Sequence, residues 1–214
     1  MKRDRGVSLI VVLIALVLIS FAAVALLRST DTATLIAGNL AFKKAALASG
    51  DAGSEVAITW LDANSANAIL LADSAANGYY ATSYEGCDLT GTRTPNDHSD
   101  DVDWTVAGAT PNCNMSGLVP APQPAGIAAG YSVSFVINRM CNAAGDPNSL
   151  VAADGVTPMV CSRVSGGTTS GSTRTGGYYG NLPLAGTAQV YYRITTRIAG
   201  PRNTVRFIQA YVVQ

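Results

Sequence analysis

Charged residues and histidine are scarce in this sequence. Only 13% of the 214 residues are charged, and 14 Lys and Arg balance 14 Asp and Glu, so the formal net charge is zero. A chain without a basic field is not expected to hold nucleic acid through phosphate contacts. The sequence has one histidine and lacks the GxSxG, P-loop and dinucleotide-binding motifs, so nucleophilic, phosphoryl-transfer and hydride chemistry are not indicated. We therefore expect no enzyme activity, no cofactor and no small-molecule substrate.

A zinc site is not indicated either, because no two cysteines have CxxC spacing and His98 is the only histidine. Carboxylate oxygens are the ligands that Ca²⁺ prefers. Four aspartates surround this histidine: Asp97, Asp100, Asp101 and Asp103. Their spacing matches no calcium-binding loop motif, which favours a solvated acidic loop. Calcium binding by residues 97–103 is the alternative interpretation.

A long apolar run stands at the N-terminus, where residues 7–27 carry no charged side chain. As a helix this run would measure roughly 31 Å, close to the ~30 Å hydrocarbon core of a bilayer. Lys2, Arg3 and Arg5 precede it, and the next basic residue is Arg28. The positive-inside rule therefore predicts an inner-membrane protein with a single span, a cytoplasmic N-terminus and an extracytoplasmic remainder.

Two other interpretations of this run use the same hydropathy. A secretory signal has a shorter apolar core followed by small residues, and Ala22, Ala23 and Ala25 could serve as its cleavage site. A plain single-span anchor needs no cleavage at all. Hydropathy alone does not separate an anchor from a processed segment.

The first residues resemble a type IV prepilin leader. Residues 2–10 read Lys-Arg-Asp-Arg-Gly-Val-Ser-Leu-Ile, a short basic stretch that ends in glycine before an apolar helix. The resemblance implies that a prepilin peptidase cuts between Gly6 and Val7 and that the new amino terminus of Val7 is methylated. Residues 28–31, 37–40 and 41–46 are similar to the N-terminal region of PilX-type minor pilins.

The chain departs from the pilin pattern at two positions. Many pilins begin the mature chain with Phe, where this sequence has Val7, and most carry Glu at the fifth mature position, where it has Val11. In the family that Glu neutralises the amino terminus of a neighbouring subunit. Within the family, the absence of this Glu implies a subunit that enters the filament first and lies at its tip.

The resemblance implies a minor pilin that helps to initiate a type IV pilus in a tip or priming complex. The implied partners are other minor and major pilins, the prepilin peptidase, the inner-membrane assembly platform and, before assembly, the membrane. The protein would end in the pilus at the cell surface. A type II secretion pseudopilin and a single-span membrane-anchored binding module are the alternative functions.

The resemblance and the patterns together divide the chain into a leader (1–6), a transmembrane or filament-core helix (7–27), a helix continuation (28–62) and an extracytoplasmic head (63–214). The continuation is rich in alanine, and Gly38, Gly50 and Gly53 are expected to let it bend. Apolar residues spaced loosely along one face are expected to pack on the head: Ile36, Leu40, Leu47, Val56 and Trp60.

The head is predicted to be an α+β domain. Segments rich in Val, Ile, Tyr, Phe and Thr predict four strands at residues 131–140, 159–164, 189–198 and 204–213. We expect a four-stranded antiparallel meander packed on the long helix, an order similar to the pilin fold. Residues 79–124 are rich in turn signals, and the Gly- and Ser-rich residues 165–177 are expected to form a mobile surface loop.

All four cysteines follow the apolar run, in a compartment where disulfides persist. Four cysteines allow three connectivities. Cys141 ends one predicted strand and Cys161 lies in the next, so this pair is favoured. The remaining pair is then Cys87 with Cys113.

Overall fold

The computed structural model describes residues 7–104, 112–164 and 189–214. The leader at residues 1–6 and the Gly- and Ser-rich loop at 165–177 lie outside these ranges. In chain order the elements are helix α1 (Val7–Ala63), the short helices η1 (Ala68–Leu71) and η2 (Ala75–Asn77), strands β1 (Tyr79–Tyr80), β2 (Ser132–Arg139), β3 (Arg163–Val164) and β4 (Gln189–Gly200), the short helix η3 (Pro201–Asn203) and strand β5 (Thr204–Val213).

The chain divides into two compact units, Met1–Ala45 and Ala46–Gln214. The boundary falls inside α1, within the stretch that the sequence assigns to a helix continuation. The first unit contains the N-terminal part of α1, and the second contains its last turns together with the sheet. We call the second unit the head.

Helix α1 is continuous through all three of its glycines. Two of them allow a close approach to the sheet. A Cβ atom built on Gly50 would lie 2.3 Å from Cδ1 of Ile208, and one on Gly53 would lie 3.0 Å from Cγ2 of Thr196. Side chains at both positions would crowd the strands, so we infer that these glycines allow α1 to pack closely on the sheet. The expectation that they let the helix bend is not needed to explain them.

The face of α1 that packs in the head is made of small residues. Its buried members recur every three or four positions, as one helical face requires, and they are Ala46, Ser49, Gly50, Gly53, Ser54, Ala57 and Leu61. Ser54 Oγ lies 2.9 Å from Thr196 Oγ1 across the interface between helix and sheet. The helix therefore approaches the strands closely because its contact face carries little bulk.

The large apolar residues of α1 lie mostly elsewhere. Val56 and Trp60 pack against the core as predicted. Leu47 belongs to the head and is 56% exposed, so the expectation that it packs on the head is wrong. Ile36 and Leu40 belong to the first unit. The stripe of small residues occupies the contact face, and the larger side chains fall outside it.

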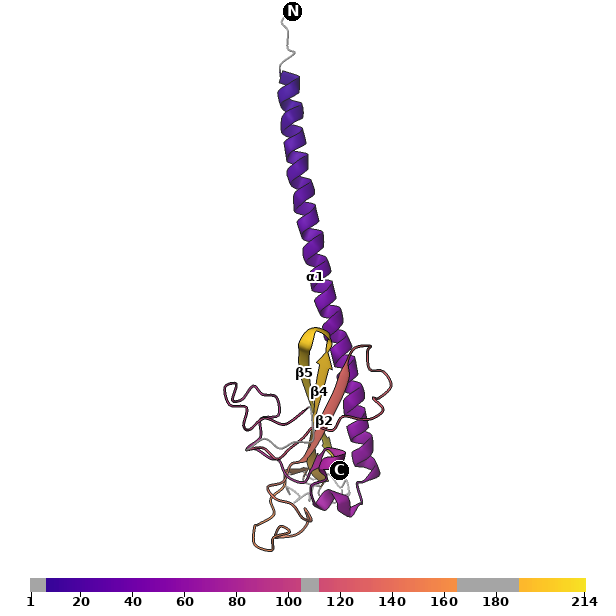
Figure 1. Ribbon diagram of the computed structural model, residues 1–214, viewed down its shortest axis with the longest axis vertical. Coiled ribbons are helices and arrows are strands. Elements are labelled where there is room, and N and C mark those ends of the chain that lie inside the picture. The colour runs from indigo at the N-terminus through magenta and orange to yellow at the C-terminus, as the bar shows by residue number, and fades with distance from the viewer. Residues whose placement is uncertain (1–6, 105–111, 165–188) are drawn as a thin grey trace, which may run out of the picture. The chain divides into compact units, whose positions relative to one another are not determined.

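The sheet differs from the predicted four-stranded antiparallel meander. It has five strands and is mixed, with β4 at its centre. β2 pairs antiparallel with β4 from Ser132↔Ala199 to Arg139↔Tyr192, and β5 pairs antiparallel with β4 over ten residue pairs. These three strands lie side by side (Figure 1). The α+β class is confirmed, but the strand order and the purely antiparallel character are wrong.

Two short strands account for the error. β1 pairs parallel with β2, with Tyr79 opposite Ile137. β3 contributes only two residues and pairs with the start of β4, Arg163 opposite Val190. β4 is 12 residues long, so it can pair with β2 and also extend past it to β3. A meander would have required β2 and β3 to pair with each other.

Strand β2 is buried on both faces after its first residue. Successive side chains of a strand point to opposite faces. Accordingly, Phe135 and Ile137 join the core cluster that contains Ala57 and Leu61 of α1, whereas Val136 joins a second cluster around Cys87 and other residues of the loops that follow β1. The loops between β1 and β2 therefore form a second hydrophobic layer over the sheet.

Candidate functional site

The N-terminal part of α1 is the first candidate site. Leu9 to Ile14 are each more than half exposed, and consecutive residues of a helix point in different directions. The helix is therefore apolar on all sides, the pattern of a segment that lies in lipid or in a bundle of helices. Its length and composition are sufficient to cross a membrane.

Hydroxyl side chains of α1 bond to the backbone of their own helix at two positions, Ser20 and Thr32. Ser20 Oγ donates to the carbonyl of Leu16 at 2.8 Å, one helical turn earlier. Thr32 Oγ1 donates to the carbonyl of Arg28 in the same way. Such bonds satisfy a hydroxyl without any outside partner. The helix can therefore lie in an apolar environment with the Ser20 hydroxyl satisfied.

The processing residues fall at the edge of the described structure. Gly6 lies outside the described residues, and Val7 is the first residue of α1. Val11 lies within the apolar segment and is 58% exposed. The first turn of α1 carries no acidic residue, so the described part of this segment offers no carboxylate near Val7.

Both disulfides lie in the head and use all four cysteines. The structure joins Cys87 to Cys113 and Cys141 to Cys161, with Cα atoms 5.1 Å and 4.0 Å apart. This is the pairing that the predicted strand positions favour. Cys141 and Cys161 face each other in an antiparallel bridge, which places the second disulfide at the base of the loop that follows β2.

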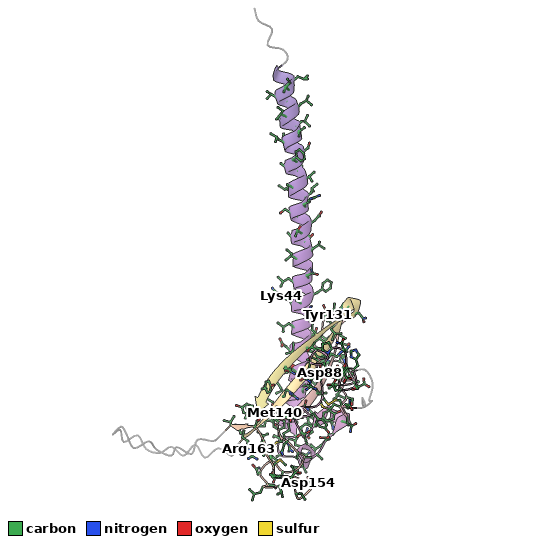
Figure 2. All side chains as sticks on the ribbon, turned by 90° about the vertical axis from the view of Figure 1, so that its left-hand side faces the viewer. Lys44, Asp88, Tyr131, Met140, Asp154 and Arg163 are labelled. Atoms are coloured by element: carbon green, nitrogen blue, oxygen red, sulfur yellow. A yellow bond between two sulfur atoms is a disulfide. The ribbon has the colours of Figure 1, made fainter. Side chains whose placement is uncertain are left out.

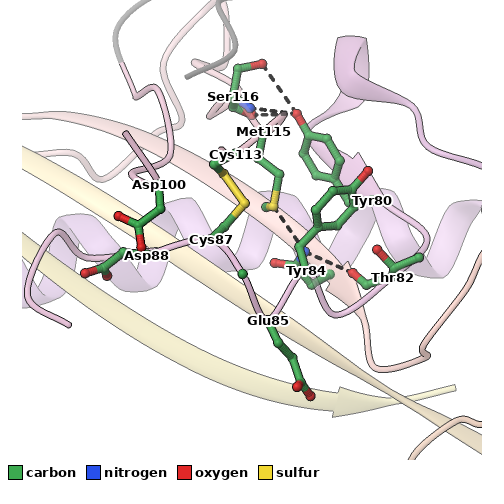
Figure 3. The surroundings of a disulfide bond; sticks show 12 residues. Tyr80, Thr82, Tyr84, Glu85, Cys87, Asp88, Asp100, Cys113, Met115 and Ser116 are labelled. Carbon is green, nitrogen blue, oxygen red and sulfur yellow. Dashed lines mark hydrogen bonds between the residues drawn. A yellow bond between two sulfur atoms is a disulfide. The ribbon is translucent and has the colours of Figure 1, made fainter. Parts of the chain in front are cut away.

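The Cys87–Cys113 disulfide sits in the second hydrophobic layer (Figure 3). Met115 is fully buried beside it, and Asn138 of β2 donates a hydrogen bond to the Met115 sulfur at 3.7 Å. The hydroxyl of Tyr80 accepts from the backbone N–H of Ser116 at 2.7 Å. The disulfide and Tyr80 thus fix the returning loop against the sheet.

Asp88 organises the turn after Cys87, and our sequence interpretation did not identify it. Asp88 as a residue is 3% exposed, and its carboxylate accepts hydrogen bonds from four backbone N–H groups, those of Thr90, Gly91, Arg93 and Thr94. Burial alone would raise the pKa of Asp88, but the four donors outweigh burial and hold the pKa below its ordinary value. The signal in the sequence was the Asp-Leu-Thr-Gly run, since Asp and Gly favour such turns.

The acidic residues around His98 use their carboxylates for local contacts. Asp100 pairs with Arg93 at 3.0 Å, and Asp101 Oδ2 lies 2.8 Å from Nδ1 of His98. Asp97 accepts from the backbone and hydroxyl of Ser99. Within the ranges that the structure describes, no group of three or more His, Cys, Asp or Glu side chains could hold a metal ion. The carboxylates of Asp97, Asp100 and Asp101 are therefore engaged in contacts within this loop.

Arg139, at the end of β2, is the second residue that sequence reasoning missed. It is fully buried. Its guanidinium donates to the backbone carbonyls of Leu70, Ala81 and Ala143, at 2.9, 3.0 and 3.2 Å respectively. The hydroxyl of Tyr79 donates to the Leu70 carbonyl as well. Burial raises the pKa of Tyr79, although the nearby Arg139 charge opposes the shift. Arg139 therefore ties three segments of the head together.

The described chain thus has an apolar helix and a head with two disulfides, in which Asp88 and Arg139 bond to backbone groups. An open cleft of about 460 Å³ adjoins the Cys141–Cys161 disulfide, and Glu85 and Asn142 are among its lining residues.

Comparisons with protein-family models, curated proteins and solved structures found no match to this chain.

Proposed function

We propose that this chain is a minor pilin-like subunit that takes part in initiating a type IV pilus, in a tip or priming complex. One observation carries the proposal above the others: a single uninterrupted helix is apolar on all sides in its N-terminal part, while its last turns form the contact face of a disulfide-bonded head. The residues preceding the helix supply a prepilin-like leader.

The proposed mechanism is assembly without catalysis. The apolar segment starts in the inner membrane and then leaves the bilayer for the core of a filament, where contacts with other pilin helices replace contacts with lipid. Because the Ser20 hydroxyl bonds to the helix's own backbone, this hydroxyl stays satisfied during the move. The assembly platform and the prepilin peptidase act on the helix, while other pilins contact both helix and head.

Val11 supports a position at the tip. A pilin that lacks Glu at this place cannot neutralise the amino terminus of a neighbouring subunit. Burial of an unpaired ammonium group costs several kcal/mol. A subunit that enters first avoids this cost, because no earlier amino terminus awaits a partner.

The mass of the N-terminal peptide from native cells tests the proposal. We expect a chain that begins at Val7 with a methylated amino terminus. A matched variant, Gly6→Val, should keep Met1 and accumulate in the membrane. A wild-type chain that keeps Met1 would favour the single-span anchor, and a cut near Ala25 would favour a secreted domain.

A type II secretion pseudopilin shares the cleavage and the helix, so the N-terminal mass does not separate it from a pilus subunit. Purified surface filaments do. We expect the chain in sheared pili, and its absence from them together with a loss of protein secretion on deletion would favour the pseudopilin.

A further inference from the structure

The two disulfides of the head differ in how closely solvent approaches them. Cys87 is 6% exposed and Cys113 is 2% exposed, and both lie in the second hydrophobic layer together with Met115. In the other pair Cys141 is buried, but Cys161 is only partly buried. Cys161 is therefore the most exposed of the four cysteines, and its bond is the more accessible one.

The open cleft of about 460 Å³ leads to the same bond. Cys141 and Cys161 both line this cleft together with residues 82–85, whereas Cys87 and Cys113 do not line it. Thiol–disulfide exchange begins when a thiolate attacks a sulfur atom, so access to the sulfur helps to decide which disulfide reacts. The cleft thus gives an attacking thiol a route to one of the two bonds.

The backbone around this accessible bond is paired independently of it. The N–H of Ser162 donates to the carbonyl of Met140 at 2.8 Å, and the N–H of Asn142 donates to the carbonyl of Val160 at 3.0 Å. Figure 2 shows Met140 close to Arg163, the residue that follows Ser162. These hydrogen bonds join the neighbours of the two cysteines directly, so the pairing does not require the bond between the sulfur atoms.

The loop between these two cysteines has further anchors on the head. The N–H of Gly145 donates to the carbonyl of Leu71 at 2.7 Å. Ala152 is buried, and Met159 packs against the main core cluster. The outer part of the loop faces solvent, with Leu150 90% exposed. Because the anchors do not involve the disulfide, opening of this bond leaves the loop attached to a folded head.

We propose that the Cys141–Cys161 disulfide is a thiol-exchange site, open to a dithiol reductant in the folded head, and that Cys87–Cys113 is a closed structural bond. The proposal concerns the head alone. It goes beyond the role in pilus assembly and does not depend on cleavage of the leader or on entry into a filament.

The exchange takes place in two steps. A thiolate of the dithiol attacks Sγ of Cys161 through the cleft, the S–S bond of the protein breaks, and Cys141 leaves as a thiolate that takes a proton from water. The second thiol of the reductant, as its thiolate, then attacks the mixed disulfide and releases Cys161, which is protonated in turn. Two electrons pass to the protein, and the dithiol becomes a disulfide.

Limited reduction of the purified full-length chain in detergent tests the proposal. The chain is treated with dithiothreitol for increasing times, and free thiols are then alkylated and located by mass spectrometry. We expect Cys141 and Cys161 to become alkylated roughly tenfold faster than Cys87 and Cys113, or more. Reduction of both bonds at the same rate, or of Cys87–Cys113 first, would overturn the proposal.

Low concentrations of urea separate attack through the cleft from attack after unfolding. Urea lowers the free energy of unfolding, so a bond that is reached only by unfolding reacts faster as urea is added. We expect the reduction rate of Cys141–Cys161 to stay constant below the unfolding transition and that of Cys87–Cys113 to rise. Parallel increases for the two bonds would show that both are closed in the folded head.

Ser162→Trp provides a test of the route itself. Ser162 is exposed and lines the cleft, so a bulky side chain there should slow reduction of Cys141–Cys161 by roughly threefold or more. The matched control is Ser149→Trp, at an exposed position of the same loop that does not line the cleft. The control should react like wild type. Equal rates from the two variants would overturn the assignment of the cleft as the route.

Discussion

At the scale of single residues, two buried charged groups hold the head by bonding to backbone atoms. Asp88 collects backbone N–H groups, and Arg139 collects backbone carbonyls. Burial of a charge is costly unless hydrogen bonds compensate it. In both cases the backbone groups that bond to the charge belong to loops or to the ends of helices and strands. Asp88 and Arg139 therefore pair backbone N–H and C=O groups that regular secondary structure leaves without a partner.

Replacement of Arg139 by leucine should destabilise the head. The carbonyls of Ala81 and Ala143 would lose the donors that the structure gives them, and we expect the free energy of unfolding to fall by about 2–4 kcal/mol. Denaturant unfolding of the full chain in detergent, with both disulfides intact, measures the change. The control is Arg163→Leu, since Arg163 donates at the surface to the side chain of Asn148. Equal losses from the two variants would contradict the role of Arg139.

Asp88 should make stability depend on pH in the acidic range. Its folded pKa is lowered, so its contribution is complete above the ordinary pKa of Asp, about 3.9, and is lost as pH falls through the folded pKa. We expect Asp88→Asn to be less stable than wild type near neutral pH and to lose less stability between pH 5 and pH 2. Urea unfolding across this range provides the measurement, and parallel pH profiles would show that Asp88 does not contribute.

At the scale of elements, the contact between helix and sheet depends on small side chains. Gly53 faces Thr196 and Val133, whose nearest atoms would lie 3.0–3.1 Å from an added Cβ. Gly38, in the first unit, has no atom within 4 Å of the same position. Both glycines belong to α1, so the same substitution at each changes helix propensity alike. A difference between the two variants then measures the effect of packing against the sheet.

Gly53→Leu should therefore destabilise the head, by about 1–3 kcal/mol, because the strands must move away from α1. Gly38→Leu should be neutral or increase helix stability, by up to about 1 kcal/mol, since leucine is the better helix former. Circular dichroism during thermal unfolding compares the two. A stabilising Gly53→Leu would show that the glycine serves flexibility after all.

The long elements could be predicted from the sequence, and the short ones could not. α1, β2, β4 and β5 each have enough residues for an apolar run or a strand-like composition to stand out. β1 has two residues, too few for any periodicity. The order of the strands depends on how far β4 extends past β2. The length of β4 depends on its pairing with β2 and β3, which lie far from it in sequence, so no local sequence pattern predicts it.

The candidate site divides in the same way. The cysteine pairing was predicted from two strands taken as neighbours, yet β2 and β3 do not pair with each other, and only an isolated bridge brings Cys141 opposite Cys161. Arg139 could not be recognised, since its acceptors Leu70 and Ala81 lie 69 and 58 residues earlier in the chain. The packing face of α1 was missed because hydrophobic periodicity is sought in large residues, and this face consists mainly of Gly, Ala and Ser.

At the scale of the whole molecule, Val11 leads to a prediction about copy number. If the chain occupies the tip, each filament should contain few copies, because a series of such subunits would bury several unpaired ammonium groups at several kcal/mol each. Quantitative immunolabelling of purified pili measures the number. Deletion should reduce the number of pili and leave a shaft made of another protein, whereas shafts built mainly from this chain would contradict the tip position.

The disulfide at the base of the exposed loop also affects how the head would respond to a pulling force. Tension applied at Leu150 or Val156 reaches β2 and β4 through Cys141 and Cys161, which are 20 residues apart in sequence but covalently joined. Leu150 is nine residues from Cys141 and eleven from Cys161, so an opened loop pulled at this point extends by roughly 31 to 37 Å at about 3.4 Å per residue, with or without the bond. With the bond intact, a load on either arm of the loop is shared between Cys141 and Cys161, so the pairings of β2 and β3 with β4 resist it together.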